Sequence, residues 1–294
     1  MNKILIFLAL FLFLSPVLLS SGAESDKARK IKRAKAWEGI GRIGKQGSGI
    51  LSLQDAASSQ KGSLFSGGSL LKKPLKEDDL IPSSVNVFLI NVKGKLFLVD
   101  TGFGGKKGHL ASRLSLLDVR PEKIHGVLLT HVHPDHAGGL LKEDGKTAAF
   151  PKAFLYISRK EYDWNIRKAA PLYRVFSRIR QAYKGRIKVI DPGKKVEGVF
   201  TLLDASGHTP GHAVFQYKDI LFIGDLLHAA SLQFEDPAIC AAYDMNKKMA
   251  VASRKKFFSL AVKKGLKVAG AHIPFPGCGT LEKEGTSFRF VPGE

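Results

Sequence analysis

The stretch Thr130-His131-Val132-His133-Pro134-Asp135-His136 places three imidazoles and one carboxylate within six residues. It follows the apolar run 126–129, which predicts a buried strand. The first two histidines lie two residues apart at the end of that strand, so they point to the same side. The proline then turns the chain, and the aspartate and the last histidine approach from a second direction. One loop can therefore supply ligands to two adjacent metal ions, and imidazole with carboxylate suits Zn²⁺ and similar ions.

Three further candidate ligands occur later in the chain, where predicted strands end. His208 lies in the stretch Gly207-His208-Thr209-Pro210-Gly211-His212, Asp225 follows the apolar run 220–224, and His272 follows the run 266–271. A carboxylate at the end of a buried strand can bridge two ions. The predicted ligands of the first ion are His131, His133, His208 and Asp225. The predicted ligands of the second ion are Asp135, His136, His272 and the shared Asp225.

The pattern on both sides of this loop predicts strands and helices in alternation. Residues 85–92 and 95–100 form a predicted hairpin. Further strands are predicted at 126–130, 201–205, 220–225 and 266–271, and helices at 110–117, 159–185 and 249–264. Residues 39–69 are rich in Gly and Ser, so we expect loops there with one short strand at 50–53. We therefore predict an α/β fold in which helices cover mixed sheets within one domain.

The order of the motifs resembles that of the metallo-β-lactamase superfamily. The matching stretches are Asp100-Thr101-Gly102, the His-x-His-x-Asp-His loop, 207–212, Gly224-Asp225 and the late His272. The last third is similar to the branch that contains methyl parathion hydrolase and quorum-quenching lactonases, over 224–230, 233–237, 254–256, 272–277 and 288–292. The resemblance implies a four-layer αβ/βα sandwich with mixed sheets and two divalent ions at one edge. It also implies a homodimer. Among zinc, manganese and iron, we expect zinc.

The expected reaction is attack by a metal-bound hydroxide on a carbonyl or phosphoryl centre, because a metal pair makes hydroxide available at neutral pH. Asp135 is a candidate proton acceptor as well as a ligand. His228, three residues after Asp225, is a candidate for polarising the substrate. Asp100 is expected to accept a hydrogen bond from a ligand imidazole, and His212 is expected to support the site rather than to bind metal.

These features favour a hydrolase of esters or lactones, with an acyl-homoserine lactone as one candidate substrate. Organophosphate or phosphoester hydrolysis is the alternative activity, and Lys106 and Lys107 after the Asp100 turn favour polar or anionic substrates. A non-catalytic, basic metal-binding protein is the third hypothesis. Only 22 residues follow His272, so we do not expect the carboxyl-terminal helical domain of glyoxalase II.

The amino-terminal residues carry a targeting pattern. Lys3 precedes an apolar run over residues 4–19, and Ser21-Gly22-Ala23 follows, so residues 1–23 are a predicted signal peptide. The protein is therefore expected to be periplasmic or secreted. A basic leader at 24–38 and the hydrolase domain at 39–294 complete the predicted organisation.

The composition is typical of a globular protein, with 44% hydrophobic and 24% charged residues, and it excludes a disordered chain. The net charge of +20 favours non-specific contact with anionic surfaces, and no motif predicts a specific nucleic-acid partner. Export would permit a disulfide between Cys240 and Cys278. The sequence leaves open whether these residues pair or lie buried as thiols.

Overall fold

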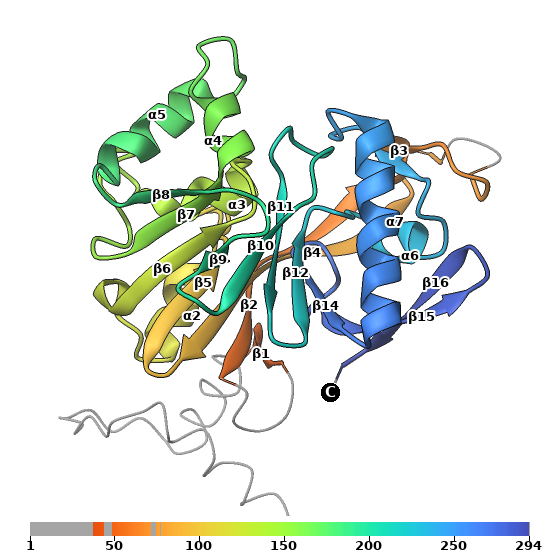
Figure 1. The fold of residues 1–294 in the computed structure, drawn as a ribbon, viewed down its shortest axis with the longest axis horizontal. Helices are drawn as coiled ribbons and strands as arrows, with labels where there is room; N and C mark the ends of the chain where they lie inside the picture. Colours follow the sequence, from red (N-terminus) through yellow and green to blue (C-terminus); the bar gives the residue numbers. More distant parts are fainter. Residues whose placement is uncertain (1–37, 44–48, 72–74, 77, 294) are drawn as a thin grey trace, which may run out of the picture.

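The computed structural model describes residues 38–43, 49–71, 75–76 and 78–293 (Figure 1). The predicted signal peptide lies outside these residues, as does the predicted leader except Glu38. The first large sheet is antiparallel from β1 to β5 and parallel from β5 to β8. Its seven strands, in spatial order, are β1 (Ile40–Arg42), β2 (Ile50–Lys61), β4 (Leu80–Val92), β5 (Lys95–Val99), β6 (Ile124–Leu129), β7 (Phe154–Ser158) and β8 (Ile187–Ile190).

The second large sheet is antiparallel except for the pair β12 and β14. Its strands, in spatial order, are β16 (Ser287–Pro292), β15 (Cys278–Glu284), β14 (Lys267–Gly270), β12 (Ile220–Gly224), β11 (Ala213–Tyr217), β10 (Phe200–Asp204) and β9 (Lys195–Val196). A small ladder joins β3 (Phe65–Ser66) to β13 (Cys240–Ala241). Both large sheets are therefore mixed, as predicted.

Helices lie on the outer face of each sheet. In the described residues, the α-helices are α2 (Leu110–Leu116), α3 (Pro134–Ala137), α4 (Arg159–Asn165), α5 (Tyr173–Ala182), α6 (Ala230–Gln233) and α7 (Lys247–Lys264), with short 3₁₀ turns η2 (Gly62–Leu64), η3 (Pro121–Lys123) and η4 (Gly138–Leu140). Figure 1 shows α4 and α5 on one side of the paired sheets and α7 on the other. None of the helices in the described part of the chain is long and apolar enough to cross a membrane.

Three buried apolar clusters separate the four layers. Between the sheets, the rings of Phe97 in β5 and Phe200 in β10 make edge contact with centroids 5.0 Å apart. Phe176 of α5 is buried against the first sheet, and Phe257 of α7 is buried against the second. Burial of apolar surface in each layer is the main stabilising term for such a fold. The predicted four-layer sandwich is confirmed.

Two predictions of secondary structure are wrong in extent. Residues 39–69 are not mainly loops, because the twelve-residue β2 pairs with β4 along its whole length. Its Ser and Gln residues are compatible with a strand because the ladder uses backbone groups. The helix expected over 159–185 is interrupted at 166–172 and forms α4 and α5. Pro171 lies in the interruption, where it removes a backbone donor and disfavours helical geometry in the preceding residue.

The two sheets are joined at the edge where the predicted ligands lie. The backbone N–H of Ala213 at the start of β11 donates to the carbonyl of Thr130 after β6, at 3.0 Å. The backbone N–H of Asn86 in β4 donates to the carbonyl of Ala271 after β14, at 2.9 Å. The side-chain amide of Asn86 adds two hydrogen bonds to carbonyls on either side of His272. Strand ends from both sheets are therefore held together around the candidate ligands.

The two cysteines do not form a disulfide. Cys240 lies in β13 and Cys278 begins β15, and both are free and buried. Burial raises the pKa of the Cys278 thiol to about 12, so this residue is an unreactive thiol at neutral pH.

Two thiols per chain should therefore be titrated by a thiol reagent after unfolding in the absence of reductant. In the folded protein the reaction should be slow, because both sulfur atoms are shielded from solvent. A spectrophotometric titration before and after adding denaturant measures both states. Fewer than two thiols in the unfolded, unreduced protein would show that a disulfide forms.

Candidate metal centre

Three imidazoles from two loops converge in the first predicted ligand set. His131 and His133 follow β6, and His208 lies in the loop between β10 and β11. The Nδ1 atom of His133 lies 2.9 Å from the Nε2 atoms of both His131 and His208. Asp225 closes the set, because its Oδ2 lies 3.2 Å from His208 Nε2 and 3.6 Å from His131 Nε2. These four side chains form a compact group with the geometry to hold a metal ion.

The second predicted set lies on the other side of the same aspartate. The Oδ1 atom of Asp225 is 3.0 Å from His136 Nε2 and 3.3 Å from His272 Nε2. Asp135 faces both imidazoles, with its Oδ2 3.4 Å from His272 Nε2 and 3.7 Å from His136 Nε2. Its side chain is 22% exposed, so this face of the cluster opens to solvent. Asp225 thus offers one carboxylate oxygen to each set, as a bridging ligand would.

The residues present fit bound cations. Asp225 Oδ1 and His136 Nε2 are buried 3.0 Å apart, but they do not have the geometry of a hydrogen bond, and neither atom has a hydrogen-bond partner among the described residues. Burial and the neighbouring His136 lower the pKa of His131, so its ring is neutral and can offer a lone pair. Burial alone would raise the pKa of Asp225, but His136 and the other imidazoles hold it well below its usual range. Burial opposes protonation of His136 and His272, but Asp225 raises the pKa of both rings, so binding of a cation there would release protons. Imidazoles around a carboxylate form the donor set that divalent metals such as zinc prefer.

Hydrogen bonds on the far side of the rings fix three of the imidazoles. His136 Nδ1 lies 2.8 Å from Asp100 Oδ2, so Asp100 contacts a candidate ligand, and its role in orienting that ligand stays a prediction. The same carboxylate accepts hydrogen bonds from the backbone N–H and the hydroxyl of Thr130, at 2.8 Å each. His208 Nδ1 lies 3.2 Å from Asp244 Oδ1, and His272 Nδ1 donates to the carbonyl of Ser84 at 2.8 Å. Such contacts select the tautomer and orient the ring toward a metal.

His212 and His228 differ in their relation to the cluster. His212 Nε2 accepts the backbone N–H of Asp225 at 2.9 Å, and its Nδ1 lies 3.2 Å from the carbonyl of Ala205. Both nitrogens are occupied, which agrees with its predicted supporting role. His228 Nε2 lies 3.1 Å from Asp225 Oδ2, and its Nδ1 has no partner among the described residues. Its place beside the cluster is compatible with contact to substrate, which stays a prediction.

Sequence reasoning missed three residues of this region. Asp244 contacts His208, the Ser84 carbonyl contacts His272, and Glu161 bonds to both loops of the first ligand set. Asp244 lies 36 residues from His208 in the sequence, so no local pattern predicts their contact. Glu161 follows Ser158 at the spacing of a helix capping box, which conceals its contacts with the loops.

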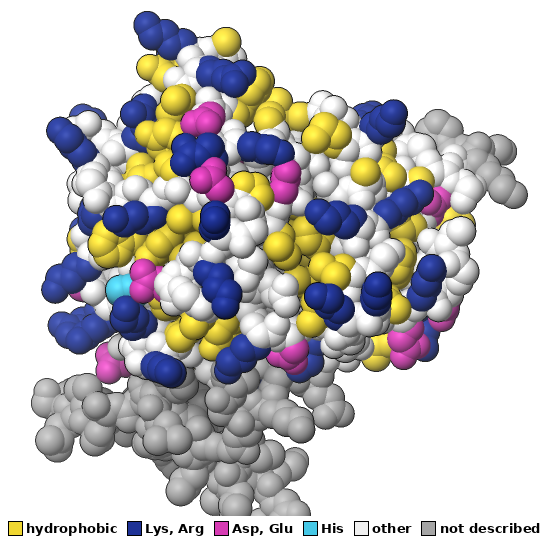
Figure 2. All heavy atoms as spheres, in the orientation of Figure 1, with side chains coloured by type: hydrophobic (Ala, Val, Ile, Leu, Met, Phe, Trp, Pro, Cys, Tyr) yellow, Lys and Arg dark blue, Asp and Glu magenta, His cyan; other side chains and the backbone are white. Residues whose placement is uncertain are grey.

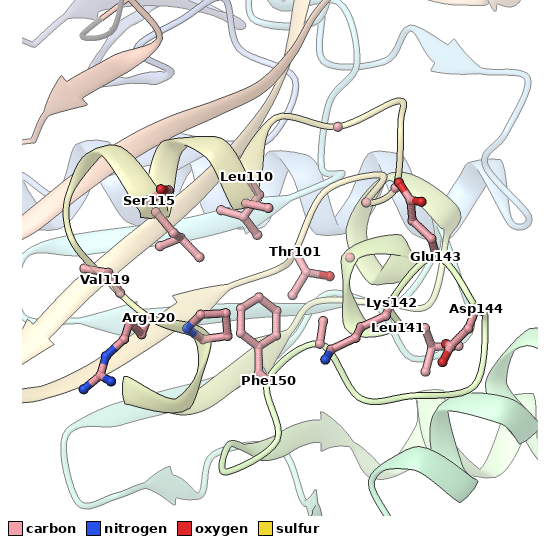
Figure 3. Close-up of a pocket in the computed structure, with 18 of the residues that line it drawn as sticks. Thr101, Leu110, Ser115, Val119, Arg120, Leu141, Lys142, Glu143, Asp144 and Phe150 are labelled. Atoms are coloured by element: carbon pink, nitrogen blue, oxygen red, sulfur yellow. The ribbon is translucent and has the colours of Figure 1, made fainter. Parts of the chain in front are cut away.

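A cavity of about 710 Å³ lies behind the loop that follows Asp100 (Figure 3). Thr101, Leu110 and Phe150 are among the residues that line it, and none of the seven predicted metal ligands does. The hydroxyl of Thr101 donates to the carbonyl of His136 at 2.8 Å. The cavity therefore adjoins the support of the metal loop and is separate from the cluster itself. Lys106 and Lys107 are exposed on the same loop.

A family model described as the metallo-beta-lactamase superfamily matches residues 80–272. The chain belongs to this superfamily. The match runs from β4 to His272 and includes all seven predicted ligands. The protein is a metal-dependent hydrolase, so the hypothesis of a non-catalytic metal-binding protein is not supported.

Two solved structures are similar to this metallo-β-lactamase superfamily member over 87% of its length. Hydrolase AbOPH, described as belonging to the beta lactamase superfamily, is 30% identical with a TM-score of 0.76, and 98% of that chain is covered. AidC, described as a dizinc quorum-quenching lactonase, is 26% identical with a TM-score of 0.75, and 98% of its chain is covered. The AidC structure holds the product N-hexanoyl-L-homoserine.

Sequence relatives cover less of the molecule. The hydroxyacylglutathione hydrolase of Methylobacillus flagellatus is 28% identical over 144 residues, which are 49% of this chain and 48% of that enzyme. Exodeoxyribonuclease WalJ of Streptococcus pneumoniae is 40% identical over 58 residues, 20% of this chain and 21% of WalJ. The chain spans about half the length of the first relative, so the activities of these proteins are not transferred to it.

Zinc should raise the thermal midpoint of the chelator-treated protein. Binding to the folded state at about 100 times the dissociation constant stabilises by about 2.7 kcal/mol, which is roughly 5–10 °C for a chain of this size. Differential scanning calorimetry with and without chelator measures the shift. Asp225→Ala should lose most of it, whereas His125→Ala, which removes a histidine remote from the cluster, should keep it. An equal shift in both variants would place the bound zinc elsewhere.

Proposed function

We propose that the protein is an exported hydrolase that holds two divalent ions, with zinc favoured, and cleaves a carboxylic ester or lactone. The observation that carries this proposal is Asp225, whose two oxygens face two separate groups of ligands. The similarity to AidC, a dizinc lactonase with a homoserine product, supports the reaction class. An acyl-homoserine lactone is one candidate substrate.

When bound, the ions would supply an ionisable water at neutral pH and a Lewis acid for the substrate carbonyl. The first group, His131, His133 and His208, and the second, Asp135, His136 and His272, would hold them, with Asp225 shared. Burial opposes ionisation of Asp135, but His136 and His272 hold its pKa well below its usual range. Its ionised carboxylate on the open side of the cluster can accept a proton from an attacking water and pass it to the leaving oxygen.

His228 is the proposed contact for the substrate carbonyl or its leaving oxygen. Burial lowers the pKa of His228 to about 4, so the ring is neutral and can donate one N–H. Its ring stacks on His272 with centroids 5.2 Å apart and lies 5.2 Å from the ring of Tyr243. These neighbours fix the plane of the ring beside the ligand groups.

An apolar rim next to the cluster supports an acyl substrate. Tyr243, Met245 and Met249 are 38%, 49% and 44% exposed, and the backbone N–H of Met245 donates to the carbonyl of His208. Methionine side chains are flexible and polarisable, so they adapt to apolar chains of different length. The apolar rim consists of these three side chains, and the segment between them also carries the exposed Lys247 and Lys248. It would lower the free energy of a bound acyl chain by removing it from water.

Phosphoester hydrolysis is the second candidate. The exposed Lys106 and Lys107, together with the net charge of +20, favour anionic substrates over neutral ones. The same two groups of ligands would serve a phosphoryl centre. The substrate, rather than the metal centre, therefore distinguishes the two activities.

The metal-loaded protein should hydrolyse an acyl-homoserine lactone or an aryl ester faster than methyl parathion. Hexanoyl and decanoyl lactones belong in the same panel, because the rim should favour the longer chain through a lower KM. Asp225→Ala should reduce the rate at least about 100-fold, because both ligand groups lose a member. Turnover of the phosphotriester alone would overturn the ester and lactone assignment in favour of the second candidate.

Export and surface contacts belong to the same proposal. The pattern of residues 1–23 supports a periplasmic or secreted location, and the resemblance to the methyl parathion hydrolase branch supports a homodimer.

Residues 159–188 hold ten Lys and Arg residues but only two acidic ones. Figure 2 shows Lys and Arg side chains over much of the visible face, including the protrusion that α4 and α5 form. This segment is the proposed contact for anionic surfaces.

Arg167, Lys168 and Arg174 are exposed on that protrusion, next to the exposed Ile166 and Val175. Replacing the three cations by Glu should reduce sedimentation with vesicles that contain phosphatidylglycerol, and salt should have the same effect. The matched control replaces Lys255, Lys263 and Lys264 of α7 by Glu, with an equal change in charge. Equal losses in both variants would show that only the net charge matters.

A further inference from the structure

Glu161 is a buried carboxylate for which the described residues supply only neutral hydrogen-bond donors. It lies three residues after Ser158, whose hydroxyl caps α4 by accepting the backbone N–H of Glu161 at 3.1 Å. The side chain is 1% exposed. An ionised carboxylate without a cation is costly to bury unless hydrogen bonds compensate for the lost water. The positions of these donors therefore indicate the structural role of Glu161.

Both oxygens of Glu161 bind the loops that carry the first ligand group. Its Oε1 accepts the backbone N–H of Val132 at 3.1 Å, and Val132 lies between His131 and His133. Its Oε2 accepts the hydroxyl of Thr209 at 2.6 Å, and Thr209 follows His208. The same oxygen also accepts the backbone N–H of Gly211, two residues after Thr209, at 3.2 Å. One carboxylate thus connects the two segments that place three imidazoles.

The contact between α4 and the loop that carries His208 leaves little room for either backbone to shift. The hydroxyl of Ser158 donates to the carbonyl of Gly211 at 2.5 Å. A Cβ atom on Gly211 would lie only 1.9 Å from the backbone nitrogen of Glu161, so only glycine fits there. Asn165, one turn along α4, donates to Glu161 Oε1 at 3.1 Å and holds the carboxylate from the other side. The distance between the two loops is therefore set by Glu161 and its close neighbours.

The second ligand group is supported by different residues. His136 is held by Asp100, and His272 is held by the carbonyl of Ser84. The structure gives Glu161 no hydrogen bond to any of these described residues or to Asp135. Loss of the Glu161 carboxylate should therefore disturb one half of the centre and spare the other.

We propose that Glu161 is a positioning residue that sets the spacing of the two loops and thereby the affinity of the group His131, His133 and His208 for its ion. It leaves the affinity of the group Asp135, His136 and His272 unchanged. This inference rests on the proposed binding of two ions. It assigns Glu161 no contact with metal or substrate.

The test measures zinc affinity at each group separately, by competition with a chromophoric chelator. His272→Ala leaves the first group intact, and His208→Ala leaves the second intact. Adding Glu161→Gln to each background should lower affinity about 10–100-fold in the first and leave it within about twofold in the second. Glu197→Gln makes the same change at a carboxylate that bonds to Tyr156 and to neither ligand loop, so it serves as the matched control and should leave both affinities unchanged.

Equal losses in both backgrounds would show a general structural role, and unchanged affinity in both would show no role; either result overturns the inference. Thr209→Val removes a single donor and should lower only the affinity of the first group, so it tests the same claim if Glu161→Gln fails to fold. Wild-type protein must bind two zinc ions in the same assay. A single ion in the wild type would contradict the proposed function itself, whereas two ions with no selective loss would contradict only the role of Glu161.

Discussion

The position of the Asp225 carboxylate is the constraint on which the rest of the centre depends. Asp225 follows the last residue of β12, and its backbone N–H is held by the ring of His212. Gly224 before it has a φ of 48°, and a Cβ atom there would lie 2.6 Å from His212 Nε2. A glycine is therefore needed for the chain to turn and present one carboxylate oxygen to each ligand group. The proposed binding of two ions rests on this single side chain.

The sandwich brings the ligands together from segments far apart in the sequence. β6 belongs to the first sheet, whereas β12 and β14 belong to the second, and backbone hydrogen bonds join their ends. Seven imidazole and carboxylate groups in one small volume would repel or remain unsatisfied without cations. The apolar core between the sheets offsets that cost and keeps the ligands in place. The fold holds the ligands rigidly at this edge of the sandwich, and bound ions are expected to complete the centre.

The seven candidate ligands could be identified from the sequence because each lies in a dense motif or directly after an apolar strand. The structure brings them together, and their binding of metal stays a prediction. Asp244 and Glu161 could not be predicted, because each acts on a segment more than 25 residues away and has a bland local setting. Only residues 50–53 of β2 were predicted, because the polar residues that follow resemble a loop, although the backbone of β2 pairs with β4 from Ile50 to Lys61. The sequence did not determine the substrate for a related reason. The apolar rim of Tyr243, Met245 and Met249 is placed by tertiary hydrogen bonds and not by a local pattern, and the fold supports several reactions.

The most direct measurement is anomalous X-ray diffraction at the zinc edge from crystals of the zinc-loaded protein. Two peaks about 3.5–4 Å apart are expected, on either side of the Asp225 carboxylate. One should lie among His131, His133 and His208, and the other among Asp135, His136 and His272. A single peak would contradict a two-ion centre. A second ion held instead by His208, His228 and Asp244, which also lie within reach of one another, would contradict the assignment of the ligands.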